Sequence, residues 1–127
     1  MRSRVLVSAV SLALLACASG PSSGGTSRNR DLITQEEIEA QPTSTAYDLV
    51  RRVRPAWFRN RGPSSIRSGS PSLPVVYIDE VWSGGLEALR RVSTQIIREI
   101  QFINGRDATT KWGLDHGGGV IMVRTGR

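Results

Sequence analysis

The chain is poor in the residues that build metal sites and disulfide frameworks. Its 127 residues include one cysteine, Cys17, and one histidine, His116. A single cysteine excludes a disulfide within the chain, so the fold has to be held together by packing. One histidine without a second histidine or a neighbouring cysteine is a poor start for a zinc site. We therefore expect neither a metal centre nor a cofactor.

The motifs of common enzyme classes are also missing. The sequence has no phosphate loop and no dinucleotide fingerprint, and none of its serines lies in a nucleophile elbow. His116, next to Asp115, could be imagined as a general base, but a loop residue is the simpler interpretation. Asp79 and Glu80 could be mistaken for a catalytic pair, although a solvated turn is the simpler interpretation. We predict that the protein is not an enzyme.

The N-terminal segment has the features of an export signal. Arg2 and Arg4 precede an apolar stretch from Val5 to Ala16, which is too short to span a membrane as a mature helix. The stretch runs into Cys17 and resembles the processing site of bacterial lipoproteins; an ordinary secretory peptide is the alternative. Because the lone cysteine lies where lipid attachment requires it, we predict a signal peptide over residues 1–16 and lipidation of Cys17.

The residues after Cys17 bear on location and domain organisation. Ala18 stands where inner-membrane lipoproteins of enteric bacteria carry aspartate, so we expect a lipid anchor in the outer membrane of a Gram-negative bacterium, with the protein facing the periplasm. Residues 17–30 are rich in serine and glycine and are predicted to form a flexible tether. We expect one folded domain over residues 31–127.

Positive charge exceeds negative charge. The 17 Lys and Arg residues against 11 Asp and Glu residues give a net charge of +6, and removal of Arg2 and Arg4 with the signal peptide lowers it to +4. The basic residues are spread along the chain, so we predict no nucleic-acid partner. Contact with anionic lipid or a carboxylate-rich protein wall would suit this distribution, as would a merely solvated surface.

Short helices are predicted at three places. Thr34 and Glu37 form a capping-box pattern that starts a helix over residues 35–40. Two further helices are expected over residues 45–54 and 86–92, each with apolar residues along one side.

Extended structure is predicted around and between these helices. Trp57 and Phe58 should start an extended piece, and the Gly/Ser/Pro/Arg loop of residues 59–72 is where we expect most mobility. Composition predicts three strands: residues 75–78, 98–103 and 120–124. The apolar spacing of residues 94–103 also fits a helix, but the β-branched residues and the stop at Asn104 and Gly105 favour a strand. The sum is a small α+β domain with about four strands and several short helices.

The turn after residues 75–78 and the three tryptophans allow further predictions. Asp79 and Glu80 should turn the chain back into Val81 and Trp82, but glutamate is poor at the positive φ of a type I′ turn. We therefore expect a longer or differently shaped turn. Trp57, Trp82 and Trp112 are predicted to be core or half-buried anchors, with a stacking platform for a ligand as the alternative.

Four pieces of the sequence, in order, resemble the plug domain of TonB-dependent outer-membrane receptors. They are Leu32–Ile38, Ala46–Val53, Pro74–Val81 and Ile97–Thr125. In the last piece, four glycines stand where the plug pattern has turns: Gly105, Gly113, Gly118 and Gly119. Gly105 should let the chain leave a strand with a φ that other residues adopt at a cost, and Gly113 should end the short helix that follows. An ordinary turn is the simpler interpretation of each glycine. The resemblance implies a plug-like fold with an interaction or gating role in TonB-dependent uptake, and a separately encoded barrel as partner.

The chain also departs from the receptor pattern, which leaves other functions open. We expect no barrel, because the sequence ends at Arg127, and no TonB-recognition segment in the tether. One alternative is a periplasmic lipoprotein that holds a small ligand, for example an anion, through arginines of the long loop such as Arg59, Arg61 and Arg67. Another is a receptor remnant without retained activity.

Overall fold

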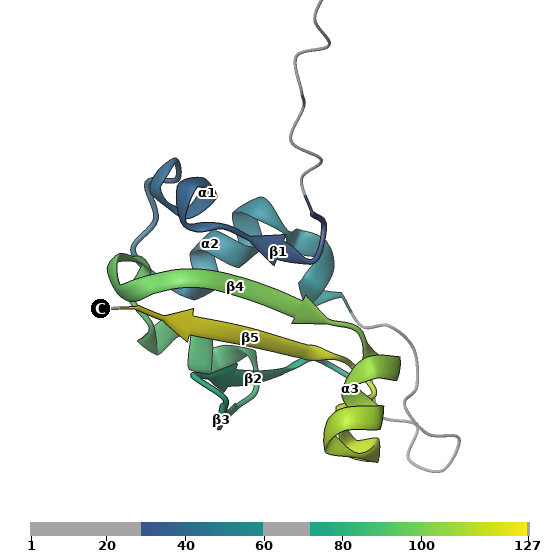
Figure 1. Cartoon of the computed structure of the whole chain (residues 1–127). Helices are drawn as coiled ribbons and strands as arrows, with labels where there is room; N and C mark the ends of the chain where they lie inside the picture. The colour runs from purple at the N-terminus through teal and green to yellow at the C-terminus, as the bar shows by residue number, and fades with distance from the viewer. Residues whose placement is uncertain (1–28, 60–71, 127) are drawn as a thin grey trace, which may run out of the picture.

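A five-stranded mixed sheet organises the domain (Figure 1). The computed structural model describes residues 29–59 and 72–126, so Cys17, the tether and most of the loop predicted to be mobile lie outside the described residues. The strands are β1 (Leu32–Ile33), β2 (Val75–Ile78), β3 (Val81–Gly84), β4 (Ile97–Ile103) and β5 (Val120–Thr125). The predicted α+β class is confirmed, with five strands where about four were expected.

The strand order places β1 and β3 on opposite edges of the sheet and the last strand of the chain, β5, in its middle. The order is β1-β4-β5-β2-β3, in which β2 and β5 run parallel and all other neighbours are antiparallel. The β2–β3 hairpin therefore forms one edge, and the two-residue strand β1 forms the other.

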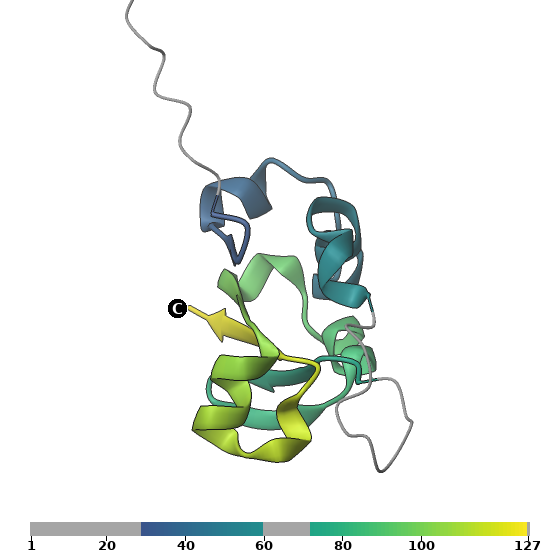
Figure 2. The same cartoon turned by 90° about the vertical axis from the view of Figure 1, so that its right-hand side faces the viewer.

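Helices cover both faces of the sheet, to different extents (Figure 2). The α-helices are α1 (Gln35–Glu39), α2 (Ala46–Val53) and α3 (Gly105–Trp112). The 3₁₀ turns are η1 (Pro55–Phe58), η2 (Leu86–Arg91), η3 (Thr94–Ile96) and η4 (Leu114–His116). The three predicted helices are confirmed, the third as the 3₁₀ turn η2, and so is the short helix expected between Gly105 and Gly113.

The main core lies between one face of the sheet and α1, α2, η1 and η2. The sheet contributes alternate residues to it, such as Ile100, Ile121 and Val123, each of which is fully buried. Apolar residues two apart on a strand share a face, which explains why the predicted strands have this pattern. The smaller core on the opposite face lies beneath α3, where Ala108 packs against Val120.

The segment at Trp57 differs from the prediction. It forms the 3₁₀ turn η1, not an extended piece, because Pro55 fixes its own φ near a helical value and so suits the first position of a helical turn. The turn brings the Trp57 ring into the core, where it stacks on Phe102 with the ring centroids 5.5 Å apart. The indole N–H donates to the Arg30 carbonyl over 3.1 Å and so fixes the chain entering β1.

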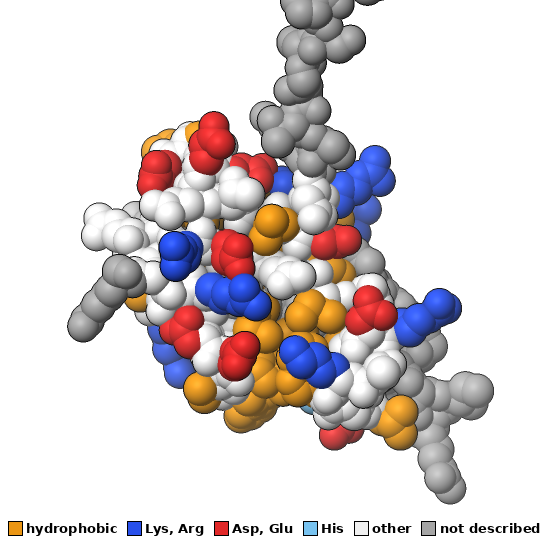
Figure 3. Space-filling model, viewed as in Figure 1, with side chains coloured by type: hydrophobic (Ala, Val, Ile, Leu, Met, Phe, Trp, Pro, Cys, Tyr) orange, Lys and Arg blue, Asp and Glu red, His pale blue; other side chains and the backbone are white. Residues whose placement is uncertain are grey.

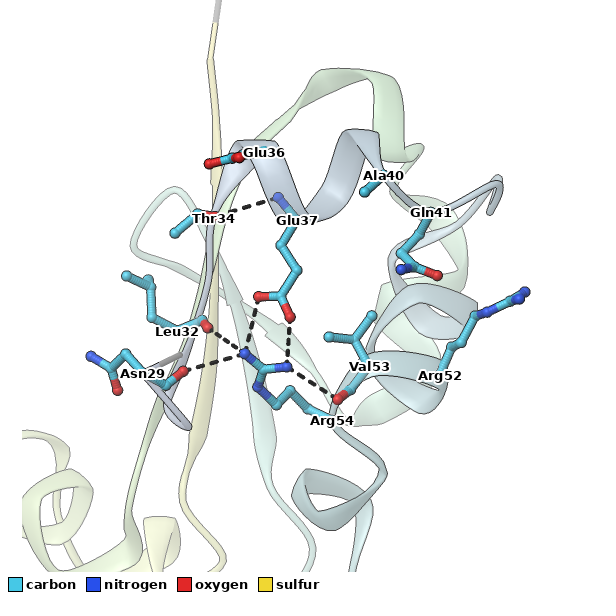
Figure 4. Close-up of a pocket in the computed structure, with 10 residues that line it drawn as sticks. All are labelled: Asn29, Leu32, Thr34, Glu36, Glu37, Ala40, Gln41, Arg52, Val53 and Arg54. Atoms are coloured by element: carbon cyan, nitrogen blue, oxygen red, sulfur yellow. Dashed lines mark hydrogen bonds and ion pairs between the residues drawn. The ribbon is translucent and has the colours of Figure 1, made fainter. Parts of the chain in front are cut away.

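Arg54, directly after α2, holds the N-terminal part of the domain together (Figure 4). Its guanidinium donates to both carboxylate oxygens of Glu37 in α1, over 2.8 and 3.0 Å. It also donates to three backbone carbonyls, those of Asn29, Leu32 and Val53. A planar guanidinium can make all these bonds at once because its donors are fixed in a fork.

Because Glu37 binds Arg54, the predicted capping box of α1 forms only in part. The Thr34 hydroxyl accepts a hydrogen bond from the Glu37 backbone N–H over 3.4 Å, as the motif requires. The Glu37 carboxylate, however, is turned to Arg54, which is a charged partner and so forms the stronger bond. Half of the predicted motif is therefore present, and its acidic residue serves a tertiary contact.

We predict that Glu37→Ala destabilises the domain by about 3 kcal/mol, because it leaves a buried guanidinium without its counter-ion. The Arg54 side chain is only 14% exposed, and the three carbonyl acceptors compensate in part. Urea unfolding followed by circular dichroism measures the change. The matched control is Glu36→Ala, on the exposed side of the same helix, which should cost less than about 1 kcal/mol. Equal losses in the two variants would contradict the role given to Arg54.

Candidate functional site

The turn of the β2–β3 hairpin contains two residues in the left-handed region. Asp79 has φ 48° and Glu80 has φ 69°, and Ile78 pairs directly with Val81. The chain therefore makes a two-residue hairpin turn, and the expectation of a longer or differently shaped turn is wrong. Aspartate tolerates this conformation, whereas glutamate adopts it at a cost of about 1 kcal/mol or more.

Hydrogen bonds between Asp79 and β5, the central strand of the sheet, stabilise this strained turn. The Asp79 carboxylate accepts hydrogen bonds from the Thr125 backbone N–H over 2.8 Å and from the Thr125 hydroxyl over 2.5 Å. These two bonds lower the pKa of Asp79 below its ordinary value, the side-chain bond more than the backbone bond. The turn is thus anchored to β5, and the Glu80 side chain is left exposed.

One row of side chains crosses all five strands on the face of the sheet that carries α3. Each pair of neighbours is directly opposite in register, so all five side chains share this face. We call this set the open row; its members are Leu32, Gln101, Met122, Tyr77 and Trp82.

The open row is exposed only in part. Met122 is 4% and Tyr77 is 8% exposed, and both belong to the core beneath α3, together with the neighbouring row of Ile103, Val120 and Val75. Leu32 and Gln101 are half-buried, and Trp82 at the other end is strongly exposed. Figure 3 shows a band of hydrophobic side chains on this face, bordered by charged groups.

The open row ends at the hairpin edge in a strongly exposed tryptophan. Trp82 is 64% exposed and its neighbour Val81 is 66% exposed. The prediction that Trp82 is a core or half-buried anchor is therefore wrong, whereas Trp57 is buried and Trp112 is half-buried as expected. Trp82 is exposed because β3 is the outer strand and no helix lies over its α3-side face among the described elements.

A charged row borders the open row at the hairpin end of the sheet. Arg124 pairs with Glu99 on the neighbouring strand over 2.8 Å. These residues line an open groove of about 480 Å³ together with Asp79, Glu80 and Arg98. Within residues 29–59 and 72–126, neither Glu80 nor Arg98 makes a side-chain hydrogen bond or an ion pair. The groove thus offers one free carboxylate and one free guanidinium.

An aromatic cluster supports the other end of this face. The Tyr77 hydroxyl lies 3.0 Å from Nε2 of His116, and Nδ1 of His116 lies 3.3 Å from the Gly113 carbonyl oxygen. The Trp112 ring packs against both the Tyr77 and His116 rings, with centroids 5.3 and 6.1 Å away. His116 therefore joins η4 to β2, a structural role that its place in the sequence did not reveal.

The four glycines of the predicted plug motif lie around α3 and the start of β5. A Cβ atom on Gly105 would lie 2.0 Å from the Gly117 carbonyl oxygen, so this residue is required for close packing and not, as predicted, for an unusual φ. Gly113 ends α3 with φ 101°, as expected, and Gly119 has φ 95°. A Cβ atom on Gly118 would lie 2.4 Å from the Leu73 carbonyl oxygen. All four serve turns or close packing.

The arginines of the predicted interaction loop are placed only in part. Arg59 is exposed directly after η1, and Arg61 and Arg67 lie outside the described residues. A larger open groove, of about 730 Å³, lies between α1 and α2. The Arg54 guanidinium in this groove is already bound to Glu37, which leaves Arg52 as its exposed cation. The groove therefore gives little support to anion binding.

Within residues 29–59 and 72–126, no group of three or more histidine, cysteine, aspartate or glutamate side chains is placed to hold a metal ion. No helix in these ranges is long and apolar enough to span a bilayer.

Comparison with known proteins found no relatives. No protein-family model matches the chain, and neither the curated proteins nor the solved structures include a match. The resemblance to plug domains therefore stays a hypothesis based on the sequence pieces described above.

We predict that Gly118→Ala destabilises the domain by about 1–3 kcal/mol, because its Cβ would overlap the backbone at Leu73. Gly85→Ala is the matched control, since nothing lies within 4 Å of the added atom and its φ is negative. The control should change stability by less than about 0.5 kcal/mol. Thermal unfolding of both variants tests this, and equal melting temperatures would show that the tight packing is wrong.

We predict that the pKa of Asp79 lies below that of a free aspartate and rises towards it in Thr125→Val, which removes the hydroxyl donor. A lowered pKa in the folded state stabilises the fold above the unfolded pKa of about 3.9, and this contribution is lost as pH falls through the folded value. NMR titration of the Asp79 carboxyl carbon measures the pKa. The same pKa in both proteins would rule out the Thr125 hydroxyl as the main cause.

Proposed function

We propose that the protein is a non-catalytic interaction module with a plug-like fold. It is held at the periplasmic side of the outer membrane by a lipid on Cys17. It docks against a separately encoded outer-membrane barrel and acts as an accessory of TonB-dependent uptake. The observation that carries this proposal is the exposed apolar edge of the sheet, where Trp82, at the end of the open row, and its neighbour Val81 are 64% and 66% exposed on the outer strand β3.

The arrangement of the sequence pieces that resemble a plug supports this function. The first piece forms β1 and α1, the third forms β2 and the hairpin turn, and the fourth forms β4, α3 and β5. These elements belong to one sheet and its covering helices. The glycines that the resemblance singled out are required at turns or close contacts in the same unit.

The exposed end of the open row is typical of a protein-binding surface. Tryptophan is enriched at interfaces and is prominent among residues that contribute most of the binding free energy. An exposed tryptophan on a rigid hairpin loses little side-chain freedom when a partner binds, because the turn beneath it is already anchored by Thr125.

Three side chains that could serve as acids or bases take part in structural contacts instead. Asp79 accepts two bonds from Thr125, Glu37 binds Arg54, and His116 lies within hydrogen-bond distance of Tyr77. Each of these contacts joins separate elements of the fold. This use of the polar residues favours an interaction module over an enzyme.

The strand order separates the start of the domain, which follows the lipid-anchored tether, from the exposed Trp82. Asn29, the first described residue, precedes β1 at one edge, and Trp82 lies on β3 at the other edge. Four inter-strand spacings amount to roughly 19 Å. A partner can therefore approach the hairpin edge without displacing the start of the domain.

A photo-crosslinking amino acid in place of Gln101 tests the proposal in cells. Gln101 is half-buried in the open row, between Leu32 and Met122, and Glu36, exposed on α1 at the other face, is the matched control position. We expect light to join position 101, and not position 36, to an outer-membrane barrel identified by mass spectrometry. Adducts that do not differ between the two positions, from protein confirmed as folded and lipidated, would refute the proposal.

A further inference from the structure

We infer that the outer surface of α2, η1 and η2 lies against the head groups of a bilayer that contains anionic phospholipid. These elements cover the face of the sheet opposite α3, so the surface is separate from the exposed hairpin edge. The inference rests on the proposed location at a membrane, and it adds the side of the domain that faces the lipid.

The first observation is a separation of charge within the folded domain. Residues 29–59 and 72–126 carry eleven basic and eleven acidic side chains, so this part of the chain is neutral. With the mutually bound Arg54 and Glu37 left out, residues 45–59 and 85–92 have five arginines and two carboxylates, a net charge of +3. The rest of the described chain has five basic and eight acidic side chains, a net charge of −3. An anionic surface therefore attracts one side of the domain and repels the remainder.

The fold brings the two positive segments together around the Tyr47 ring. The guanidinium carbon of Arg90 lies 3.8 Å from the centre of this ring, and the centre of the Phe58 ring lies 5.0 Å from it. The Ala46 backbone N–H, at the start of α2, donates to the Val92 carbonyl, directly after η2, over 2.9 Å. The exposed arginines of the two segments thus form one surface. We call this set the arginine face; its members are Arg51, Arg52, Arg59, Arg90 and Arg91.

Most guanidinium groups of the arginine face are free to bind a ligand. Within residues 29–59 and 72–126, only Arg90 of this set forms an ion pair, with Glu87 over 2.7 Å. The other carboxylate of the two segments, that of Asp48, accepts a hydrogen bond from the Thr45 hydroxyl over 2.8 Å at the start of α2. A guanidinium can bind two oxygens of one phosphate group through parallel hydrogen bonds. Four unpaired guanidiniums therefore suit the phosphate groups of lipids.

The absence of apolar groups favours a head-group layer over a protein as the ligand. Among the described residues, no large hydrophobic side chain of these two segments is strongly exposed. Protein interfaces have an apolar centre, which the arginine face lacks. Tyr47 is half-buried at its centre, and tyrosine is common where a membrane meets water. The surface is thus built to lie on head groups and not to enter the hydrocarbon.

The start of the domain lies next to the arginine face. The Arg54 guanidinium, directly after α2, donates to the Asn29 carbonyl over 3.3 Å. The twelve residues 17–28 separate this point from the proposed lipid on Cys17, and a random coil of that length spans roughly 19 Å. The anchor would therefore keep this side of the domain close to the bilayer.

Helix α1 limits the contact at one end. It covers the same face of the sheet as α2, but its exposed charges are Glu36 and Glu39, and it has no basic residue. An anionic bilayer repels these carboxylates. The contact is therefore expected at α2, η1 and η2, with α1 turned away from the lipid.

Partition onto lipid vesicles tests the inference. The protein is the mature chain, residues 17–127 with Cys17→Ser, so that no acyl chain holds it at the membrane. Its binding is measured by co-sedimentation with vesicles of equal amounts of phosphatidylglycerol and phosphatidylcholine. We expect binding that weakens as salt is added and that is lost with vesicles of phosphatidylcholine alone.

Single changes of arginine to glutamine locate the contact. Arg51→Gln, Arg59→Gln and Arg91→Gln should each lower the partition coefficient about fivefold, and the triple variant about a hundredfold. Arg106→Gln is the matched control, because Arg106 is exposed on α3 at the opposite face of the sheet and loses the same charge. It should lower the coefficient less than about twofold. Circular dichroism confirms that each variant is folded.

Several results would overturn the inference. They are a wild-type chain that does not bind the anionic vesicles, and an Arg106→Gln variant that loses as much binding as the others, which would show that net charge alone is responsible. Release by inorganic phosphate, but not by chloride at the same ionic strength, would instead indicate a site for a free anion. None of these results affects the crosslink from position 101, so the proposed function fails or stands separately.

Discussion

The contact between Arg54 and Glu37 is the interaction on which the N-terminal half of the fold depends. It joins α1, β1 and the end of α2, which pack together on one face of the sheet. Five hydrogen bonds to one guanidinium fix a two-residue strand that would be too short to hold its place alone. With this face closed, any apolar surface for a protein partner has to lie elsewhere.

Helix α3 covers only part of the opposite face of the sheet, and the proposed partner-binding surface lies on the part that α3 leaves exposed. Glycines allow α3 and the start of β5 to pack tightly at one end of the sheet. The helix buries Val120 and, in the open row, Tyr77 and Met122, but it does not reach Trp82. The β2–β3 hairpin carries this exposed tryptophan at the edge of the sheet, where the bonds between Asp79 and Thr125 hold the turn in a fixed conformation. The length of α3 and the position of the β2–β3 hairpin thus decide which side chains on this face are buried and which are exposed.

Local sequence patterns predicted most helices and strands, but not which of their side chains are exposed. The apolar spacing in residues 94–103 fitted both a helix and a strand, and β-branched content correctly favoured the strand that became β4. The pattern gave no means to distinguish Trp57 from Trp82, because burial depends on which distant strand or helix lies opposite. The open row and the contact between Tyr77 and His116 depend on register between distant segments. Such contacts have no local signal.

The central claim is that the hairpin end of the open face is covered when the protein is at work in its membrane. Amide hydrogen exchange, compared between the purified mature chain at high dilution and the native outer-membrane fraction, tests it directly. The account predicts that β3 amides exchange more slowly in the membrane fraction, while α1 amides keep their rates. Equal rates for β3 in both preparations would contradict the account.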